Sequence, residues 1–299
     1  MITGGAVISG HWLILGGAVL WGTTGTAQSF APAGFDPFVI GTLRLLVGGL
    51  ALLLLAIRQR GVRRFRLQHP IFFFLAALFI AGYQLFFFTA VVKTGVAIGT
   101  IVGIGSAPIA GGLLGFLFRG EELGRRWFLA TGLAISGCAL LSLTGDAAVT
   151  VDSVGMLLAV GAGACYAAFT LVLKALLPDN PAVSVIAVIF CLGALLLTPL
   201  LLTADSEWLL QPRAMFVVLH LGVAATAFPY LLFAWGLRTT PVSTATTLSL
   251  AEPVTAAALG FALLGEKVNL QTGIGIVLVF AGLVVLIRTR RLHSRGAMQ

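Results

Sequence analysis

Glu252 and Arg44 are an acidic and a basic residue that fall well inside long apolar stretches of this 299-residue chain. An ionisable side chain surrounded by hydrocarbon is costly, so such residues usually serve a function or pair with another polar group. Glu252 directly precedes Pro253 near the middle of its stretch. Its carboxylate is a candidate to bind a substrate ammonium group or to carry a coupled proton; alternatively, it caps backbone groups that Pro253 frees. Arg44 is a candidate structural charge that pairs with a carboxylate or with helix-end carbonyl groups, or else holds a substrate carboxylate.

Aromatic and hydroxyl side chains recur near the middle of the same stretches. We predict that they line a substrate cavity, although aromatic residues in membranes also serve as core or interface contacts. A cavity with aromatic walls, hydroxyl groups and few charges suits a small amphipathic or aromatic molecule. A phosphate would instead require several Lys or Arg at that depth. The predicted cavity residues are Trp21, Tyr83, Tyr166, Phe228, Tyr230, Trp235, Thr246, Ser249 and Glu252.

The elements that position these residues are predicted to be membrane-spanning helices. The sequence is 59% hydrophobic and only 9% charged, with a mean hydropathy of +1.07. Apolar runs of about 20 residues, the length that crosses a bilayer as a helix, recur along it. The chain is therefore predicted to be an all-α polytopic membrane protein with ten transmembrane helices and short loops. The predicted spans are 12–31, 38–57, 70–92, 96–118, 127–144, 154–175, 183–203, 214–237, 242–264 and 272–288.

A constant offset relates the two halves of the chain. Pro108 and Pro253 lie 145 residues apart. The same offset aligns Trp21 with Tyr166, Tyr83 with Phe228, Phe88 with Phe233, Gly120-Glu121 with Gly265-Glu266, and Gly137 with Gly282. We predict a first five-helix repeat over 1–148 and a second over 149–299. Because five is odd, the second repeat crosses the membrane in the opposite direction, as in many secondary transporters with a midplane site between the repeats.

The two aligned prolines are candidate markers of that site. Proline removes a helical hydrogen bond and kinks the helix, and interrupted spans at matching positions indicate a binding site. The alternative is that Pro108 and Pro253 only shape helix packing. Gly103 and Gly111 belong to GxxxG steps, which let helices pack closely in lipid. These four residues are therefore predicted to act in gating or kinking.

The charge distribution predicts orientation rather than a nucleic-acid partner. The net charge is +8, and most of the 18 Lys and Arg residues fall in alternate loops and in the C-terminal tail. By the positive-inside rule both termini are predicted to be cytoplasmic, with a multi-pass protein in the bacterial inner membrane. The expected partners are the lipid bilayer, a small-molecule substrate and, as a candidate coupling ion, the proton. We expect no nucleic acid, metal or cofactor.

The chain resembles the ten-helix EamA branch of the drug/metabolite transporter superfamily. The resemblance rests on Trp21-Gly22, Arg44, Pro108 followed by Gly120-Glu121, and Glu252-Pro253 followed by Gly265-Glu266. Within that branch it is most similar to the YddG-type exporters of aromatic and other hydrophobic amino acids. The resemblance implies a basket of ten helices, with spans 1, 3, 4, 6, 8 and 9 around a central cavity and spans 5 and 10 at the ends.

These observations favour a secondary transporter that exports small amphipathic metabolites, foremost aromatic and other hydrophobic amino acids, by alternating access. The first alternative is a multidrug or other metabolite exporter of the same fold. A remote alternative is an intramembrane enzyme that uses Ser106 and His220 as a dyad, which requires the two side chains to lie within hydrogen-bond reach. We expect no enzymatic activity.

Overall fold

The computed structural model describes residues 9–142, 152–201, 204, 207–265 and 269–288, and within these ranges every regular element is helical. The first-half elements are α1 (Gly10–Trp21), α2 (Thr23–Ser29), α3 (Pro37–Arg58), η1 (Gly61–Arg64), α4 (Pro70–Arg119) and α5 (Arg125–Ser142). The second-half elements are α6 (Ser153–Leu176), α7 (Ala182–Leu201), η2 (Glu207–Leu210), α8 (Pro212–Leu219), η3 (His220–Ala227), α9 (Phe228–Leu237), α10 (Val242–Leu248), η4 (Ser249–Ala251), α11 (Glu252–Leu264) and α12 (Leu270–Arg288).

Eight helical segments of the described residues are long and apolar enough to cross a membrane, and their ends lie within three residues of the predicted spans. The predicted span 12–31 is also helical but is divided at Gly22 into α1, of 12 residues, and α2, of 7. The predicted span 127–144 corresponds to α5, which begins with Arg125 and Arg126. The all-α polytopic architecture predicted from the hydropathy pattern is thereby confirmed.

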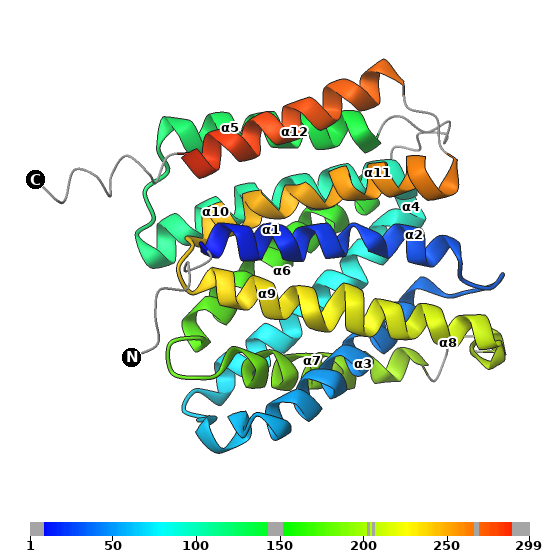
Figure 1. The fold of residues 1–299 in the computed structure, drawn as a ribbon, viewed down its shortest axis with the longest axis vertical. Coiled ribbons are helices and arrows are strands. Elements are labelled where there is room, and N and C mark those ends of the chain that lie inside the picture. The colour runs from blue at the N-terminus through cyan, green and yellow to red at the C-terminus, as the bar shows by residue number, and fades with distance from the viewer. Residues whose placement is uncertain (1–8, 143–151, 202–203, 205–206, 266–268, 289–299) are drawn as a thin grey trace, which may run out of the picture.

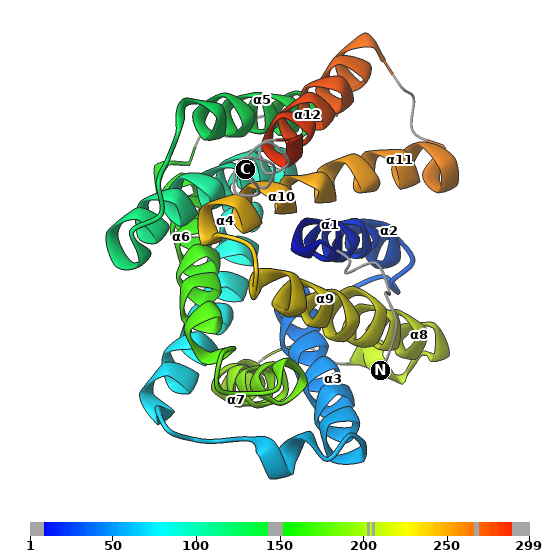
Figure 2. The ribbon, with the colours of Figure 1, turned by 60° about the vertical axis from the view of Figure 1, so that its left-hand side comes forward.

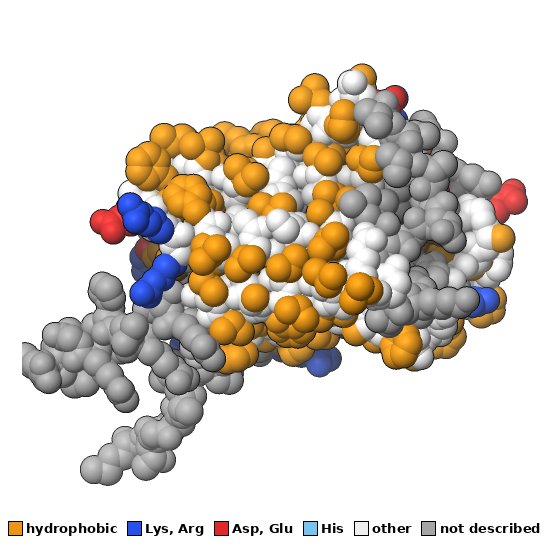
Figure 3. Space-filling model, turned by 90° about the horizontal axis from the view of Figure 1, so that it is seen from above, with side chains coloured by type: hydrophobic (Ala, Val, Ile, Leu, Met, Phe, Trp, Pro, Cys, Tyr) orange, Lys and Arg blue, Asp and Glu red, His pale blue; other side chains and the backbone are white. Residues whose placement is uncertain are grey.

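The outer surface of the molecule is apolar over the length of the helices (Figure 3), and the charged side chains visible there gather mostly at its two ends. Leu157 is 72% exposed and Phe118 is 70% exposed, and many other large apolar side chains are also exposed. Such a surface would be a liability in water, where exposed apolar patches rarely exceed a few hundred Å². In a bilayer the same surface contacts hydrocarbon, which explains why these residues face outward.

Helices that the 145-residue offset aligns pack together across the two halves. α3 packs on its counterpart α7, and α5 packs on its counterpart α12, while α1 with α9 mirrors α4 with α6. The α5–α12 pair lies at one end of the molecule and the α3–α7 pair at the other (Figures 1 and 2). This is the pairing expected for two repeats related by a pseudo-two-fold axis. The remaining helices therefore surround the centre.

The spans nearest the centre are interrupted in different ways. The eighth span contains a π-helix, η3, before Pro229, and the ninth contains a 3-10 turn, η4, directly before Glu252 and Pro253. In α4, by contrast, the residue with non-helical backbone angles is Gly95, at φ 81° and ψ 161°, rather than Pro108. Glycine tolerates that positive φ because it has no Cβ. The two aligned prolines thus sit in different backbone environments.

The close contact of α5 with α12 makes a stability prediction. We expect Gly137→Ala to lower the melting temperature in detergent, because the added Cβ would lie 2.6 Å from the Gly275 carbonyl oxygen and 2.8 Å from the Val279 nitrogen. Overpacking of this kind costs about 1–3 kcal/mol. Gly132→Ala is the matched control, since no atom outside the helix lies within 4 Å of its added Cβ. Equal melting temperatures of the two variants, measured by thermal denaturation, would contradict the contact.

Candidate functional site

A cavity of about 50 Å³ lies where the interrupted spans meet, between α1, α2, α3, α4, α6, α9, α10, η4 and α11. Its walls are formed by Trp21, Thr24, Arg44, Tyr83, Gly103, Ile104, Ala107, Tyr166, Tyr230, Thr246, Ser249, Leu250 and Glu252. Sites for drug-sized ligands usually have about 300–1,000 Å³. In the conformation described, the cavity is therefore narrow compared with such sites.

Most of the predicted cavity residues line this space, but two do not. Trp21, Tyr83, Tyr166, Tyr230, Thr246, Ser249 and Glu252 line it, as do Arg44 and Gly103. Phe228 and Trp235 are instead 51% and 42% exposed, and Phe228 lines an apolar depression on the outer surface with residues of α3. For these two residues the structure differs from the prediction.

The π-helix explains the difference at Phe228. The 145-residue offset makes Phe228 the counterpart of Tyr83, which lines the cavity. Phe228 follows directly after η3, however, and a π turn takes more residues than an α turn. Side chains beyond η3 are consequently rotated relative to those of an uninterrupted α-helix. Tyr230, two residues further along, faces the cavity instead.

Four lining residues were missing from the prediction: Thr24, Ile104, Ala107 and Leu250. Two of them had a signal in the sequence. Thr24 follows Trp21 by three residues, the spacing that places side chains on one helical face. Ala107 is the offset counterpart of Glu252. Ile104 and Leu250 are ordinary apolar residues with no distinguishing pattern.

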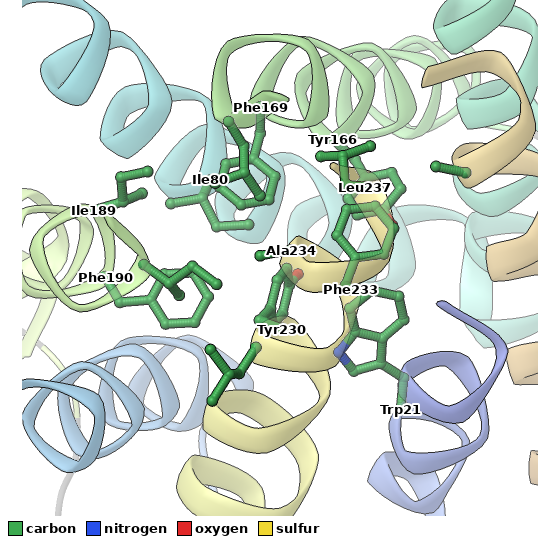
Figure 4. Close-up of a cluster of buried hydrophobic side chains, with 14 of the residues drawn as sticks. Trp21, Ile80, Tyr166, Phe169, Ile189, Phe190, Tyr230, Phe233, Ala234 and Leu237 are labelled. Carbon is green, nitrogen blue, oxygen red and sulfur yellow. The ribbon is translucent and has the colours of Figure 1, made fainter. Parts of the chain in front are cut away.

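Aromatic rings form one continuous wall beside the cavity (Figure 4). The Trp21 ring lies 4.8 Å from the Tyr230 ring and 5.4 Å from the Phe233 ring, measured between centroids. Tyr166 extends the wall, with its ring 6.2 Å from Trp21 and 5.8 Å from Tyr83. Edge-to-face and tilted contacts at such distances are favourable for aromatic pairs. Because each ring is held by several others, the wall has a defined shape.

Arg44 connects α3 to the interrupted eighth span. Its Nε donates a hydrogen bond to Thr226 Oγ1 at 2.8 Å, and its Nη2 donates to the Ala225 carbonyl oxygen at 3.1 Å. Pro229 lies four residues after Ala225 and has no N–H, so it cannot donate the α-helical hydrogen bond to that carbonyl. The guanidinium supplies a donor in its place, while the same side chain also lines the cavity.

Glu252 lies at the junction of η4 and α11, where Pro253 removes a backbone donor for Ser249. The Glu252 N–H donates to the Ser249 carbonyl oxygen, which closes a 3-10 turn. The Ser249 carbonyl therefore has a backbone hydrogen-bond donor and does not need one from a side chain. Among the described residues, the Glu252 carboxylate has no hydrogen bond or ion pair, although it lies within electrostatic range of Arg44. Its side chain lines the cavity.

The hydroxyl groups near Glu252 are engaged mainly with the backbone. Ser249 Oγ donates to the Ala245 carbonyl at 3.1 Å and shares a 2.9 Å hydrogen bond with the Tyr166 hydroxyl. Thr246 Oγ1 donates to the Val242 carbonyl at 3.0 Å. These bonds fix the side-chain rotamers of this wall. Hydroxyls that donate in this way present their oxygen lone pairs to other groups.

Three of the four residues predicted to act in gating or kinking lie along α4, and the fourth, Pro253, lies at the start of α11. Gly103 lines the cavity, and its carbonyl oxygen accepts a 3.1 Å hydrogen bond from Ser106 Oγ. Pro108 is buried directly beside this segment. At Gly111 an added Cβ would collide with the Thr246 side chain, so α4 and α10 approach each other closely there. Close approach at glycine is the property expected of GxxxG contacts.

Glu121 joins the end of the fourth span to the start of the ninth. Its carboxylate accepts hydrogen bonds from the Val242 N–H at 2.6 Å, the Ser243 N–H at 2.9 Å and Ser243 Oγ at 2.7 Å. Gly120, at φ 62°, ends α4 in the left-handed conformation typical of helix ends. We call this arrangement the Glu121 clamp. The aligned Glu266 lies outside the described residues.

Ser106 and His220 do not form the dyad that an intramembrane enzyme would need. Ser106 Oγ donates to the Gly103 carbonyl, and His220 Nε2 shares a 3.0 Å hydrogen bond with Thr23 Oγ1. A serine nucleophile requires its base within hydrogen-bond reach. Among the described residues there is also no group of three or more His, Cys, Asp or Glu side chains suited to hold a metal ion.

Comparison with known proteins identifies a transporter. A protein of Bacillus subtilis (strain 168) named "Uncharacterized transporter YwfM" is 44% identical over 273 residues, which cover 91% of this chain and 92% of that protein. The "Threonine/homoserine exporter RhtA" of Salmonella typhimurium is 33% identical over 155 residues, about half of each chain at 52% and 51%. A solved crystal structure with 21% sequence identity has the same fold, with a TM-score of 0.83 over 95% of this chain and 98% of that one.

The family comparison covers both halves of the chain separately. The sequence model described as "EamA-like transporter family" matches residues 8–143 and again residues 153–288. The first match covers the five predicted spans before the segment 144–152, and the second covers the five predicted spans after it. The chain is therefore a multi-pass membrane protein that belongs to the EamA-like transporter family.

Proposed function

We propose that this protein is a secondary transporter that exports small amphipathic metabolites, foremost aromatic and other hydrophobic amino acids. The observation on which the proposal rests is the central cavity, which combines an aromatic wall with one carboxylate and one guanidinium. An amino acid has an ammonium group, a carboxylate group and a side chain. Each has a chemically matched neighbour in Glu252, Arg44 and the aromatic rings, respectively.

The composition of the cavity wall supports this class of cargo over phosphorylated ones. Arg44 is the one cationic side chain among the residues that line the cavity. Phosphate recognition generally uses several charge-assisted hydrogen bonds from Arg, Lys or backbone groups. The partial likeness to a protein named as an exporter of threonine and homoserine also supports an amino-acid cargo. The preference for aromatic side chains is our own inference from the aromatic wall.

An alternating-access mechanism is supported by the small cavity and by the Glu121 clamp. A cavity of about 50 Å³ is smaller than the sites that usually hold such ligands, so we propose that the walls separate when the substrate enters or leaves. The clamp holds the end of α4 against the start of α10. We propose that release of this contact opens one side of the cavity while the other stays closed.

The orientation of the protein follows from its basic residues. Arg58 ends α3, Arg119 ends α4 and Arg125 begins α5. In the order of the spans these positions fall on one side, which the positive-inside rule makes cytoplasmic. We accordingly propose a location in the bacterial inner membrane, with the Glu121 clamp at the cytoplasmic end. Both termini, which lie outside the described residues, would then also be cytoplasmic.

Transport by purified protein in liposomes tests the cargo. We expect saturable flux of at least one of radiolabelled phenylalanine, tryptophan, leucine, methionine and threonine, because the cavity offers partners for both charged groups of an amino acid. Flux of none of the five would rule out the proposed cargo. Flux of a cationic drug in place of all five would favour the multidrug alternative.

The role of Glu252 is tested by Glu252→Gln in the same liposomes. If the carboxylate binds the substrate ammonium, we expect flux to fall roughly tenfold or more with or without a pH gradient, since hydrogen bonds to charged groups contribute about 1.5–3 kcal/mol. If it carries a coupled proton, only the gradient-driven accumulation should disappear. Glu122→Gln, at an exposed site on the loop after α4 and outside the cavity, is the control. Unchanged flux and unchanged response to the gradient would remove Glu252 from both roles.

The clamp is tested by hydrogen–deuterium exchange in Glu121→Gln. The amide oxygen of glutamine replaces only one acceptor, so the Val242 and Ser243 N–H groups lose a charged partner. We expect the peptide that contains both residues to exchange about tenfold faster or more, as hydrogen bonds to charged groups contribute roughly 1.5–3 kcal/mol. Glu122→Gln should leave the exchange of that peptide as in the wild type. Equal exchange in both variants would show that the contact does not hold the two spans together.

A further inference from the structure

We propose that Trp21 and Thr24, together with Arg44, form a subsite for the carboxylate group of the transported molecule. The inference rests on the proposed function and deepens it, because it assigns one end of the substrate to particular donors. All three side chains line the central cavity. They come from α1, α2 and α3, around the break at Gly22 that separates the first two helices.

The Trp21 indole has a buried donor with no protein partner. The residue is 5% exposed, and its Nε1–H forms no hydrogen bond with any residue that the structure describes. Contacts with the rings of Tyr230, Phe233 and Tyr166 hold the indole in place, and its nitrogen lies on the side that faces Tyr230 (Figure 4). A buried donor left unsatisfied is destabilising, and an indole N–H can only donate. A group that accepts a hydrogen bond in the cavity would satisfy it.

Thr24 provides a second unpaired polar group three residues later. Its Oγ1 is buried and has no hydrogen-bond partner in the described part of the chain. The neighbouring Thr23 makes the contrast clear, because its Oγ1 donates to the Leu20 carbonyl at 2.8 Å and also pairs with His220. Two adjacent residues of the same type thus differ in that only the one that lines the cavity lacks a partner.

Arg44 adds positive charge to these two donors. A guanidinium has five N–H groups, and the two hydrogen bonds to Thr226 and Ala225 use Nε and Nη2 while fixing the side chain. The remaining N–H groups form no hydrogen bond with the described residues and could donate to a ligand. An indole N–H, a hydroxyl and a held guanidinium together form a set of donors with a positive charge. Carboxylate is the part of an amino acid that such a set recognises.

The position of Glu252 fits the opposite charge of the same substrate. At Gly22 an added Cβ would lie 2.7 Å from the Glu252 carbonyl oxygen, so α11 packs directly against the α1–α2 break. The three donor residues and Glu252 all line the same cavity. A molecule whose ammonium and carboxylate groups are joined through a single carbon can contact both. The subsite accordingly selects zwitterionic α-amino acids over amines of the same shape.

The experiment compares each amino acid with its carboxamide, which keeps the ammonium group and the side chain but lacks the negative charge. Binding of phenylalanine, phenylalaninamide, threonine and threoninamide to the full-length protein is measured by calorimetry in detergent. Trp21→Phe keeps an aromatic ring and removes the N–H, and Thr24→Val removes only the hydroxyl. Trp208→Phe and Thr240→Val are matched controls, because Trp208 Nε1 and Thr240 Oγ1 are also buried without partners but do not line the cavity.

We expect the wild type to prefer the acid over its amide. In Trp21→Phe and in Thr24→Val the Kd for the acid should rise roughly tenfold to a hundredfold, as for loss of a hydrogen bond to a charged group. The Kd for the amide should change far less, and neither control should alter the ratio. Because the readout is a ratio between two ligands on the same variant, a loss of folded protein cannot produce it.

Two results would overturn the inference in distinguishable ways. If the wild type binds acids but Trp21→Phe and Thr24→Val keep the wild-type acid-to-amide ratio, the subsite is wrong while amino-acid transport stands. If the wild type binds neither acid and shows no amino-acid flux in liposomes, the proposed function fails and the subsite fails with it.

Discussion

At membrane depth a backbone carbonyl that loses its helical donor cannot turn to water, and this constraint shapes the centre of the molecule. Pro229 leaves the Ala225 carbonyl without an α-helical donor, and Arg44 donates to it from α3. A half-buried charge, otherwise expensive at this depth, thereby joins α3 to the π-helical segment of the eighth span. The π-helix in turn brings Tyr230 rather than Phe228 to the cavity. The guanidinium, the helix break and the aromatic wall are thus parts of one arrangement.

In the ninth span a proline also leaves a carbonyl without its α-helical donor, but here the backbone itself supplies the replacement. Pro253 has no N–H to donate to the Ser249 carbonyl. This carbonyl accepts a hydrogen bond from the Glu252 N–H instead, in a 3-10 turn. Because the backbone N–H of Glu252 donates this hydrogen bond, the Glu252 side chain is not needed to cap the helix. The two halves therefore contribute different charges to the cavity. The first half contributes Arg44, whose guanidinium donates hydrogen bonds to the eighth span. The second half contributes Glu252, whose carboxylate we propose to bind the substrate or a proton.

The interruptions also explain how a tightly packed helical bundle can change shape. Interiors packed at crystal-like density do not deform smoothly, so transitions occur at breaks and at contacts that can be made or lost as units. The cavity is bordered by Trp21 and Thr24 beside the α1–α2 break, by Tyr230 of the helix that follows the π-helix, and by the 3-10 turn. The Glu121 clamp holds the end of the fourth span to the start of the ninth. Rigid helices with a few junctions of this kind suit the alternating-access mechanism that we propose.

The sequence by itself determined the spans, the repeat and the two intramembrane charges, because hydropathy and a constant offset are properties of the chain alone. Trp21 and Tyr166 could be assigned to the centre in this way, since Trp21 ends the regular helix α1 just before the break at Gly22, and Tyr166 lies inside the regular helix α6. Only the tertiary structure decided which way side chains point after an interruption: Phe228 and Trp235 turn outward beyond a π-helix. It alone decided also that Thr24 and the Trp21 N–H lack partners, because hydrogen-bond satisfaction depends on neighbours distant in the chain.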